Sequence, residues 1–224
     1  MMFKTIYEYE DFAQSTTNED GSRVYVNASG GAYPSATTVL SVLSKEGIAA
    51  WRKRVGDEEA DKISKQASTR GTKLHNVTEA FLKNEELDFQ AQKFSLLDLE
   101  LFNKFMPILM PIDNIHCQEL ALYSDHLRMA GRVDCIAEYN GALAVIDFKT
   151  SGKPKKKEHI KSYFMQATAY AIMYEERTGI PVPNIVILVA VEGDEPQVFV
   201  EKRDNWAKEL LRTRDYFENG YYLT

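Results

Sequence analysis

Cysteines and long apolar runs are scarce in this chain of 224 residues, which contains only two cysteines. Cys117 and Cys135 lack a CxxC spacing, which argues against a disulfide framework, a zinc site and a four-cysteine iron–sulfur cluster. No apolar run approaches the roughly 20 residues that a membrane-spanning helix requires. Residues 1–12 mix charged and aromatic side chains, unlike a secretory or transit peptide. We therefore expect a cytoplasmic protein with no membrane partner.

An excess of positive charge is also missing. The formal net charge is -6, which argues against a protein that coats nucleic acid by bulk electrostatics. Basic residues nevertheless gather locally, in three groups: 52–54; Lys62, Lys65, Arg70 and Lys73; and Lys153, Lys155, Lys156, Lys157 and Lys161. Such groups are usually solvated faces, and for the first two this interpretation and a binding surface are equally well supported.

The composition, 44% hydrophobic and 27% charged, is that of a globular chain that buries one substantial core. Residues 1–34 look irregular, apart from a short strand at 23–27 and a turn at Gly30-Gly31. The spacing of apolar residues then predicts helices from Ser35 or Thr37, over 46–55, over 57–83, and over 93–109, the last closed by Pro107 and Pro111. We expect residues 1–112 to form a helical N-terminal lobe.

The pattern changes near residue 115. Strands are expected at 115–123, 129–139, 142–150, 184–191 and 196–201, with helices over 159–177 and 204–219. Three successive strands predict an antiparallel meander, and the helix before the fourth strand predicts a crossover. The expected fold is α/β (α+β): a mixed sheet with flanking helices over residues 113–224, joined to the lobe in one compact domain.

The dipeptide Asn140-Gly141 lies between two β-prone runs and predicts a type I′ hairpin turn, which fixes the register of both strands. Counting outward from the turn places Asp134 opposite Asp147. Directly opposed residues have Cβ atoms roughly 4.5–5.5 Å apart, a separation at which like charges are destabilising. Lys149 emerges on the same face as Asp147, because side chains alternate along a strand.

Two interpretations of these acids are equally good when the pair is taken alone. Either both are solvated on an exposed sheet face, with Lys149 neutralising one of them, or they bind a metal ion. Val145 and Ile136 share their face, so the acids end a partly buried row, and buried charges need pairing or a metal. Paired carboxylates are the hard ligands that Mg²⁺ or Mn²⁺ prefers.

Five sequence elements, in this order, resemble the RecB-like branch of the PD-(D/E)XK nuclease superfamily. They are Tyr33-Pro34-Ser35 with Thr37-Thr38-Val39-Leu40 and Trp51; Arg70-Gly71-Thr72-Lys73-Leu74-His75; Gly131-Arg132-Val133-Asp134; Asp147-Phe148-Lys149; and Gln166 with Tyr170. The first is similar to the start of mitochondrial and phage exonucleases of that branch. The likeness covers residues 33–175 and implies a restriction-endonuclease-like core, in a bacterium or a phage-infected host cell.

The resemblance implies hydrolysis of DNA phosphodiester bonds with one or two divalent ions, Mg²⁺ or Mn²⁺. The implied metal ligands are His75, Asp134, Asp147 and the backbone carbonyl of Phe148, with Glu119 as an additional candidate. Lys149 would orient or deprotonate the attacking water, while Gln166 and Tyr170 would brace the site or hold the strand being cut. Taken alone, His75 would be a hydrogen-bonded boundary residue, and Gln166 and Tyr170 one face of an amphipathic helix.

The implied DNA contacts are Arg70, Lys73, Lys153, Lys155, Lys156 and Lys157. Arg70 could bind phosphate with two hydrogen bonds or form local salt bridges. Val133 stands where many relatives have proline, and the scarcity of cysteine favours an enzyme without an iron–sulfur cluster. We expect an exonuclease on single-stranded or open-ended DNA, with replication or recombination proteins as further partners. The alternatives are a structure-selective or restriction-like endonuclease, and a non-catalytic nucleic-acid-binding protein that keeps the fold.

Overall fold

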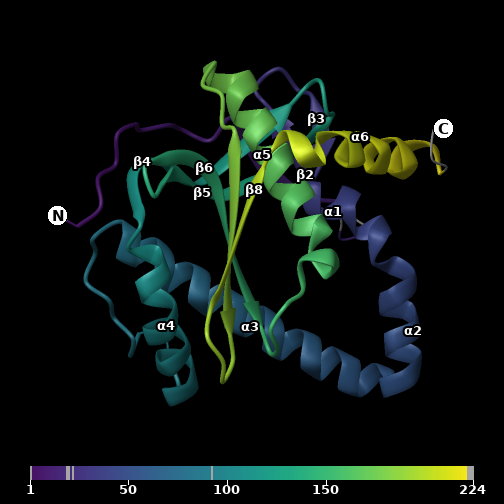
Figure 1. Cartoon of the computed structure of the whole chain (residues 1–224). Helices are drawn as coiled ribbons and strands as arrows, with labels where there is room; N and C mark the ends of the chain where they lie inside the picture. Colours follow the sequence, from purple (N-terminus) through teal and green to yellow (C-terminus); the bar gives the residue numbers. More distant parts are fainter. Residues whose placement is uncertain (1, 19–20, 22, 92, 221–224) are drawn as a thin grey trace.

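The structure, a computed structural model, describes residues 2–18, 21, 23–91 and 93–220 (Figure 1). Its central sheet has five strands in the order β4-β5-β6-β7-β8. These strands are β4 (Ile112–Ser124), β5 (Met129–Tyr139), β6 (Ala142–Ser151), β7 (Asn184–Val191) and β8 (Gln197–Lys202). All neighbours are antiparallel except β6 and β7, which are parallel and joined through helix α5 (Lys161–Thr178). The predicted mixed sheet, with its meander and crossover, is confirmed.

Helices cover both faces of this sheet. On one face α5 packs with α1 (Ala36–Leu40) and α6 (Asp204–Asn219), and on the other lie α3 (Asp57–Leu82) and α4 (Leu96–Leu109). Strand β6 shows why: Val145 packs on the α5 side, whereas Ala144 and Ile146 pack on the α3 and α4 side. No described helix is long and apolar enough to cross a bilayer. The division at residues 112–113 stays a prediction, because lobe helices pack directly on the core sheet.

The N-terminal lobe is less helical than predicted. Strands β1 (Ala13–Thr17), β2 (Arg23–Asn27) and β3 (Ala32–Pro34) form a small antiparallel sheet. The turn between β2 and β3 is closed by the Asn27 side chain, whose Oδ1 accepts hydrogen bonds from the backbone N–H groups of Ser29 and Gly31. The predicted strand at 23–27 is β2, whereas β1 and β3 were not predicted. Turns closed by a side chain need no hydrophobic periodicity, so the pattern of apolar residues does not indicate these two strands.

Two predicted helix ends can be compared with local hydrogen bonds. The Ser35 side chain, one of the two predicted candidates, caps α1 by accepting from the Thr38 N–H. Helix α4 starts at Leu96, three residues later than predicted, because a capping box fixes its start. The Ser95 side chain accepts from the Asp98 backbone N–H, and the Asp98 side chain accepts from the Ser95 backbone N–H. Pro107 lies inside α4 instead of ending it, so the helix forgoes one backbone hydrogen bond and continues to Leu109. Helix α2 (Lys45–Val55) buries no residue and stands away from the sheet (Figure 1).

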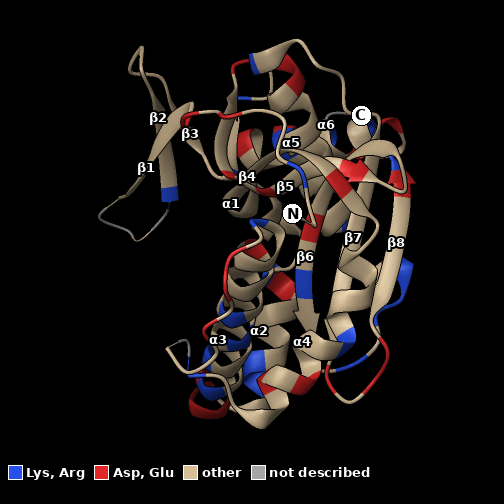
Figure 2. Ribbon diagram, turned by 90° about the vertical axis from the view of Figure 1, so that its left-hand side faces the viewer, with Lys and Arg blue, Asp and Glu red and all other residues tan. Residues whose placement is uncertain are grey.

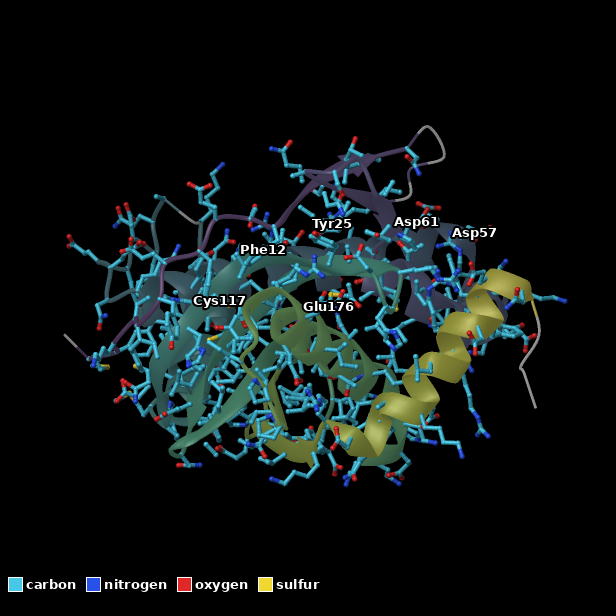
Figure 3. All side chains as sticks on the ribbon, turned by 90° about the horizontal axis from the view of Figure 1, so that it is seen from above. Phe12, Tyr25, Asp57, Asp61, Cys117 and Glu176 are labelled. Carbon is cyan, nitrogen blue, oxygen red and sulfur yellow. The ribbon has the colours of Figure 1, made fainter. Side chains whose placement is uncertain are left out.

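Residues 4–12, here called the edge segment, run along the outer edge of β4. Thr5 forms a parallel bridge with Ile115, and Ile6 N–H donates to the Ile115 carbonyl over 2.8 Å. Further along, Phe12 N–H donates to the Ala121 carbonyl over 3.0 Å. Seen from above, Phe12 lies beside the sheet at the end of this segment (Figure 3). The edge segment therefore covers backbone groups that an edge strand would otherwise expose.

Candidate active site

The candidate site lies where β5 and β6 part. Asn140 and Gly141 have φ of 51° and 76°, as a type I′ turn requires, and the ladder follows the predicted register from Tyr139–Ala142 to Cys135–Ile146. The predicted pair of Asp134 with Asp147 is not part of this ladder. The Asp134 carboxylate instead accepts a hydrogen bond of 2.8 Å from the Phe148 N–H. The side chain of Asp134 thereby occupies the fork between the two strands.

Asp147 is buried, with a side-chain exposure of 2%. Lys149 Nζ lies 2.6 Å from each of its oxygens and donates a hydrogen bond to Oδ1, while Oδ2 has no hydrogen-bond partner. The interpretation of Asp147 as a solvated surface acid is therefore wrong. Acidic and basic bands follow each other on β6 (Figure 2).

The ionisation of this pair reflects burial and mutual attraction. Burial raises the pKa of Asp147, and the charge of Lys149 opposes that rise. Burial acts to lower the pKa of Lys149, but Asp147 and Asp134 outweigh it, so the pKa of this amine is raised. Without a metal ion the amine is therefore protonated. The Lys149 Nζ also lies 5.3 Å from the centre of the Tyr163 ring.

His75 projects from α3 into the same fork. Its Nε2 donates to the Phe148 carbonyl over 2.8 Å, and its Nδ1 lies 3.7 Å from Asp134 Oδ1 and 4.0 Å from Glu119 Oε1. Burial acts to lower the pKa of His75, but the carboxylates of Glu119 and Asp134 raise it overall. Two implied ligands, the His75 ring and the Phe148 carbonyl, are thus in direct contact.

The donor atoms of His75, Glu119 and Asp134 lie within 4.8 Å of one another. Two carboxylates and an imidazole suit Mn²⁺ or Mg²⁺, and Oδ2 of Asp147, which lies 2.6 Å from Lys149 Nζ, offers a further oxygen close by. The residues present therefore fit the ion that the resemblance implies. Glu119, only an additional candidate in the sequence, belongs to the group, whereas Asp147 lies beside it.

Gln166 and Tyr170 lie on the face of α5 that covers β5. Gln166 Nε2 donates to the Tyr170 hydroxyl over 3.2 Å, and Tyr170 is 3% exposed. Burial raises the pKa of this hydroxyl. Tyr163 was not among the predicted site residues, although it precedes Gln166 by three residues and so lies on the same helix face.

The basic residues differ in exposure and in whether their side chains already pair with acidic groups. Lys73 Nζ contacts Asp98 at 2.6 Å and the Lys93 carbonyl at 2.8 Å, and Arg70 pairs with Glu192 at 2.6 Å. These two line a pocket of about 670 Å³ together with Lys62 and Lys65. In the loop after β6, Lys157 pairs with Glu201, whereas Lys153 and Lys156 are exposed and Lys155 is half-buried. Basic residues also gather along α2 and α3 (Figure 2).

Both cysteines are buried in the sheet. Burial raises the pKa of the Cys117 thiol to about 12, and it raises the pKa of Cys135 as well. Neither thiol belongs to the donor group described above, and both pack in the core as small apolar residues.

The chain resembles known proteins over most of its length. It is similar to mitochondrial genome maintenance exonuclease 1 from Homo sapiens, with 29% identity over 203 residues that cover 83% of this chain and 58% of that protein. The same protein from Mus musculus is 26% identical over 237 residues, covering 98% and 69%, and that from Xenopus tropicalis is 34% identical over 120 residues, covering 49% and 34%.

The chain thus spans 58% of the length of the human protein. Because the names of these relatives refer to the mitochondrial genome, the expected bacterial or phage origin and cytoplasmic location stay predictions. A family comparison matches residues 25–219 to the PD-(D/E)XK nuclease superfamily. This match covers both branches of the fork and the helices that flank it. The chain belongs to the PD-(D/E)XK nuclease superfamily.

Proposed function

We propose that this chain is a metal-dependent deoxyribonuclease that acts as an exonuclease on single-stranded or open-ended DNA. The observation that carries the proposal is the meeting of His75, Glu119 and Asp134 beside the buried Asp147–Lys149 pair. Membership of a nuclease superfamily and similarity to proteins named exonucleases support it.

Hydrolysis of a phosphodiester needs an activated water and stabilisation of charge on the phosphate oxygens. A bound Mg²⁺ or Mn²⁺ ion would supply Lewis acidity for both. Glu119, Asp134 and His75 would hold the ion, with Asp147 and the Phe148 carbonyl as the further ligands of the set. The Lys149 amine, fixed by Asp147 and covered by Tyr163, would hold the attacking water by a hydrogen bond and shield the charge that develops on the phosphate.

DNA contacts are assigned to exposed basic residues near this fork. Lys153 and Lys156 are exposed on the loop that directly follows β6 and form no ion pair with another described residue, so they can reach phosphates directly. Lys73 and Arg70 are already held by Asp98 and Glu192, so these two would bind DNA only after exchanging partners. The pocket that they line is the candidate path for a strand on this side.

End-labelled strands test the proposal. Linear single-stranded DNA labelled at either end, incubated with Mg²⁺ or Mn²⁺, should release short labelled products, and EDTA should prevent this. Asp147→Asn and Lys149→Met should lower the rate by at least about 100-fold while DNA binding persists. Lys104→Met replaces a half-buried lysine on α4 whose amine pairs with Glu100 among the described residues; it is the matched control and should cut normally.

Covalently closed circular DNA, tested in both single-stranded and double-stranded form, separates the alternatives. An exonuclease leaves it intact, whereas an endonuclease of either kind cuts it. DNA binding without product in any metal would support the non-catalytic alternative. Full activity of Asp147→Asn would contradict the assignment of the site.

A further inference from the structure

Glu119 adopts a backbone conformation that a strand residue rarely has. Its φ is +48°, in the left-handed region, although it lies in the middle of β4. The ladder to β5 keeps its register on both sides, with Gln118 paired to Cys135 and Leu120 to Val133. Cys117 and Leu120 both pack into the core on the α5 face, so the usual alternation of side chains changes phase at Glu119.

This conformation costs free energy for a residue with a Cβ, and it persists only where surrounding contacts enforce it. Its consequence is the direction of the side chain. Glu119 Oε1 lies 4.0 Å from His75 Nδ1, so the carboxylate belongs to the donor group of the candidate metal site. Without the change of phase, Glu119 could not share that group while Leu120 packs in the core.

Arg132 lies on the neighbouring strand β5, paired with Ala121, and its side chain reaches back to Glu119. Its Nη1 donates to the backbone carbonyl of Glu119, and its Nη2 pairs with Asp11 Oδ2 at 2.6 Å. Asp11 belongs to the edge segment and is itself fixed, because its Oδ1 accepts from the Ala121 N–H over 2.9 Å. The guanidinium of Arg132 thus joins the backbone carbonyl of Glu119 to the carboxylate of Asp11. That carboxylate is itself held by the backbone of Ala121, two residues after Glu119 on β4.

The edge segment is fastened on both sides of the strained residue. Ile6 bonds to Ile115 before it, and Phe12 bonds to Ala121 after it. Between these points Tyr9 donates to or accepts from the Tyr174 hydroxyl, which also contacts His116. Asp11 therefore reaches Arg132 from a backbone that cannot slide along β4.

We propose that Arg132 and Asp11 are positioning residues of the metal centre: they hold the main chain of Glu119 in its left-handed conformation and so present its carboxylate to the ion. This inference rests on the proposed function. The competing explanation is an ordinary surface ion pair, since the side chains of Arg132 and Asp11 are 36% and 41% exposed and such pairs contribute little to stability. An ordinary surface ion pair does not account for the hydrogen bond that Arg132 donates to the backbone carbonyl of Glu119.

Titration of the metal-free protein with Mn²⁺, followed by calorimetry and by electron paramagnetic resonance of free Mn²⁺, tests the inference. Arg132→Gln should weaken Mn²⁺ binding by about 10-fold or more, the usual effect of losing a group that orients a ligand. Asp11→Asn, which keeps an acceptor for the Ala121 N–H, should weaken it by a smaller factor. Arg128→Gln, which removes an arginine that pairs with Glu218 at the turn of the same hairpin, is the matched control and should bind as the unaltered protein does.

Kinetics provide a second readout. If positioning is the role, Arg132→Gln should need about 10-fold more Mn²⁺ for half-maximal rate but reach nearly the same kcat at saturation. A general loss of structure would instead lower kcat even at saturating Mn²⁺, and this result would overturn the inference. Should Arg132→Gln fail to fold in circular dichroism, Asp11→Asn decides by the same two measurements.

Failure of the inference and failure of the proposed function give different results. Mn²⁺ binding that Asp134→Asn abolishes, together with unchanged Mn²⁺ affinity in Arg132→Gln and Asp11→Asn, would overturn the inference and leave the nuclease assignment intact. Absence of Mn²⁺ binding and of DNA cleavage by the unaltered protein would overturn the proposed function itself.

Discussion

The Cα of Gly131 lies against the ring of Tyr170: a Cβ built at Gly131 would stand 2.8 Å from Tyr170 Cε1 and 2.9 Å from its hydroxyl oxygen. Both distances are too short for any real side chain. The glycine of the Gly131-to-Asp134 motif is therefore required by packing, because it lets α5 bring Tyr170 against β5 beside the candidate metal ligands.

Gly131→Ala should destabilise the protein by about 1–3 kcal/mol, the usual cost of forcing an extra methyl group into a packed core. It should also reduce cleavage, because the ring and the hydrogen bond from Gln166 must shift. Gly47→Ala is the matched control: apart from its chain neighbours and the backbone of its own helix, no described residue lies within 4 Å of the added Cβ, so on α2 it should stabilise by about 0.5–1 kcal/mol. Urea unfolding of both variants measures this, and equal stabilities would contradict the packing argument.

The strain at Glu119 predicts an inverted glycine preference. Glycine normally weakens a strand relative to alanine, but it tolerates positive φ. Glu119→Gly should therefore be more stable than Glu119→Ala, by about 1 kcal/mol. The neighbouring Gln118 has no positive φ, so Gln118→Ala should be more stable than Gln118→Gly. Thermal unfolding in EDTA compares the four variants, and the same order at both positions would show that Glu119 is unstrained.

The exposed lysines of the loop after β6 should govern salt dependence. Replacing Lys153 and Lys156 by glutamine should weaken DNA binding and reduce the slope of log K against log salt by about 0.7 for each lost phosphate contact on single strands. Lys73→Gln should instead lower stability, because Lys73 is held by Asp98 and the Lys93 carbonyl. An unchanged slope in the double variant would remove these lysines from the DNA interface.

His116 predicts a specific pH dependence. It is 7% exposed, its Nδ1 lies 2.9 Å from the Tyr174 hydroxyl, and burial lowers its pKa below 6.5 while Glu138 opposes this. Below that pH the unfolded chain binds more protons than the folded one, so stability present above pH 6.5 is lost as the pH falls. For one proton the loss cannot exceed about 1.4 kcal/mol per pH unit.

His116→Gln should remove this part of the acid sensitivity. The raised pKa of His75 acts in the opposite direction, contributing stability at low pH, but it is present in both proteins and cancels in their difference. Urea unfolding between pH 7 and 5 with EDTA supplies that difference. Parallel stability curves for the two proteins would contradict a buried, neutral His116.

Part of this structure could be predicted from interactions between residues that lie close together in the sequence. The turn at Asn140-Gly141 sets the register of β5 and β6 without help from distant residues, so their ladder was predicted pair by pair. The spacing of apolar residues likewise gave α3 within one residue at its end. The start of α4 at Leu96 could also have been predicted from the sequence, because Ser95 and Asp98 have the spacing of a capping box.

Contacts between distant residues account for what the sequence could not show. The left-handed Glu119 depends on Arg132 and on Asp11, more than a hundred residues away, and no local rule predicts positive φ for glutamate there. Lys73 belongs to the predicted histidine motif, but its partner Asp98 lies 25 residues further along, so its ion pair has no local signal. The departure of Asp134 from the ladder likewise reflects its bond to the Phe148 N–H.

The most direct test is anomalous diffraction at the manganese absorption edge from crystals of the protein soaked in MnCl₂. The account predicts a peak within bonding distance, about 2.0–2.3 Å, of donor atoms from Glu119, Asp134 and His75, next to Asp147. A peak that avoids these residues, or none at Mn²⁺ concentrations that support DNA cleavage, would contradict it.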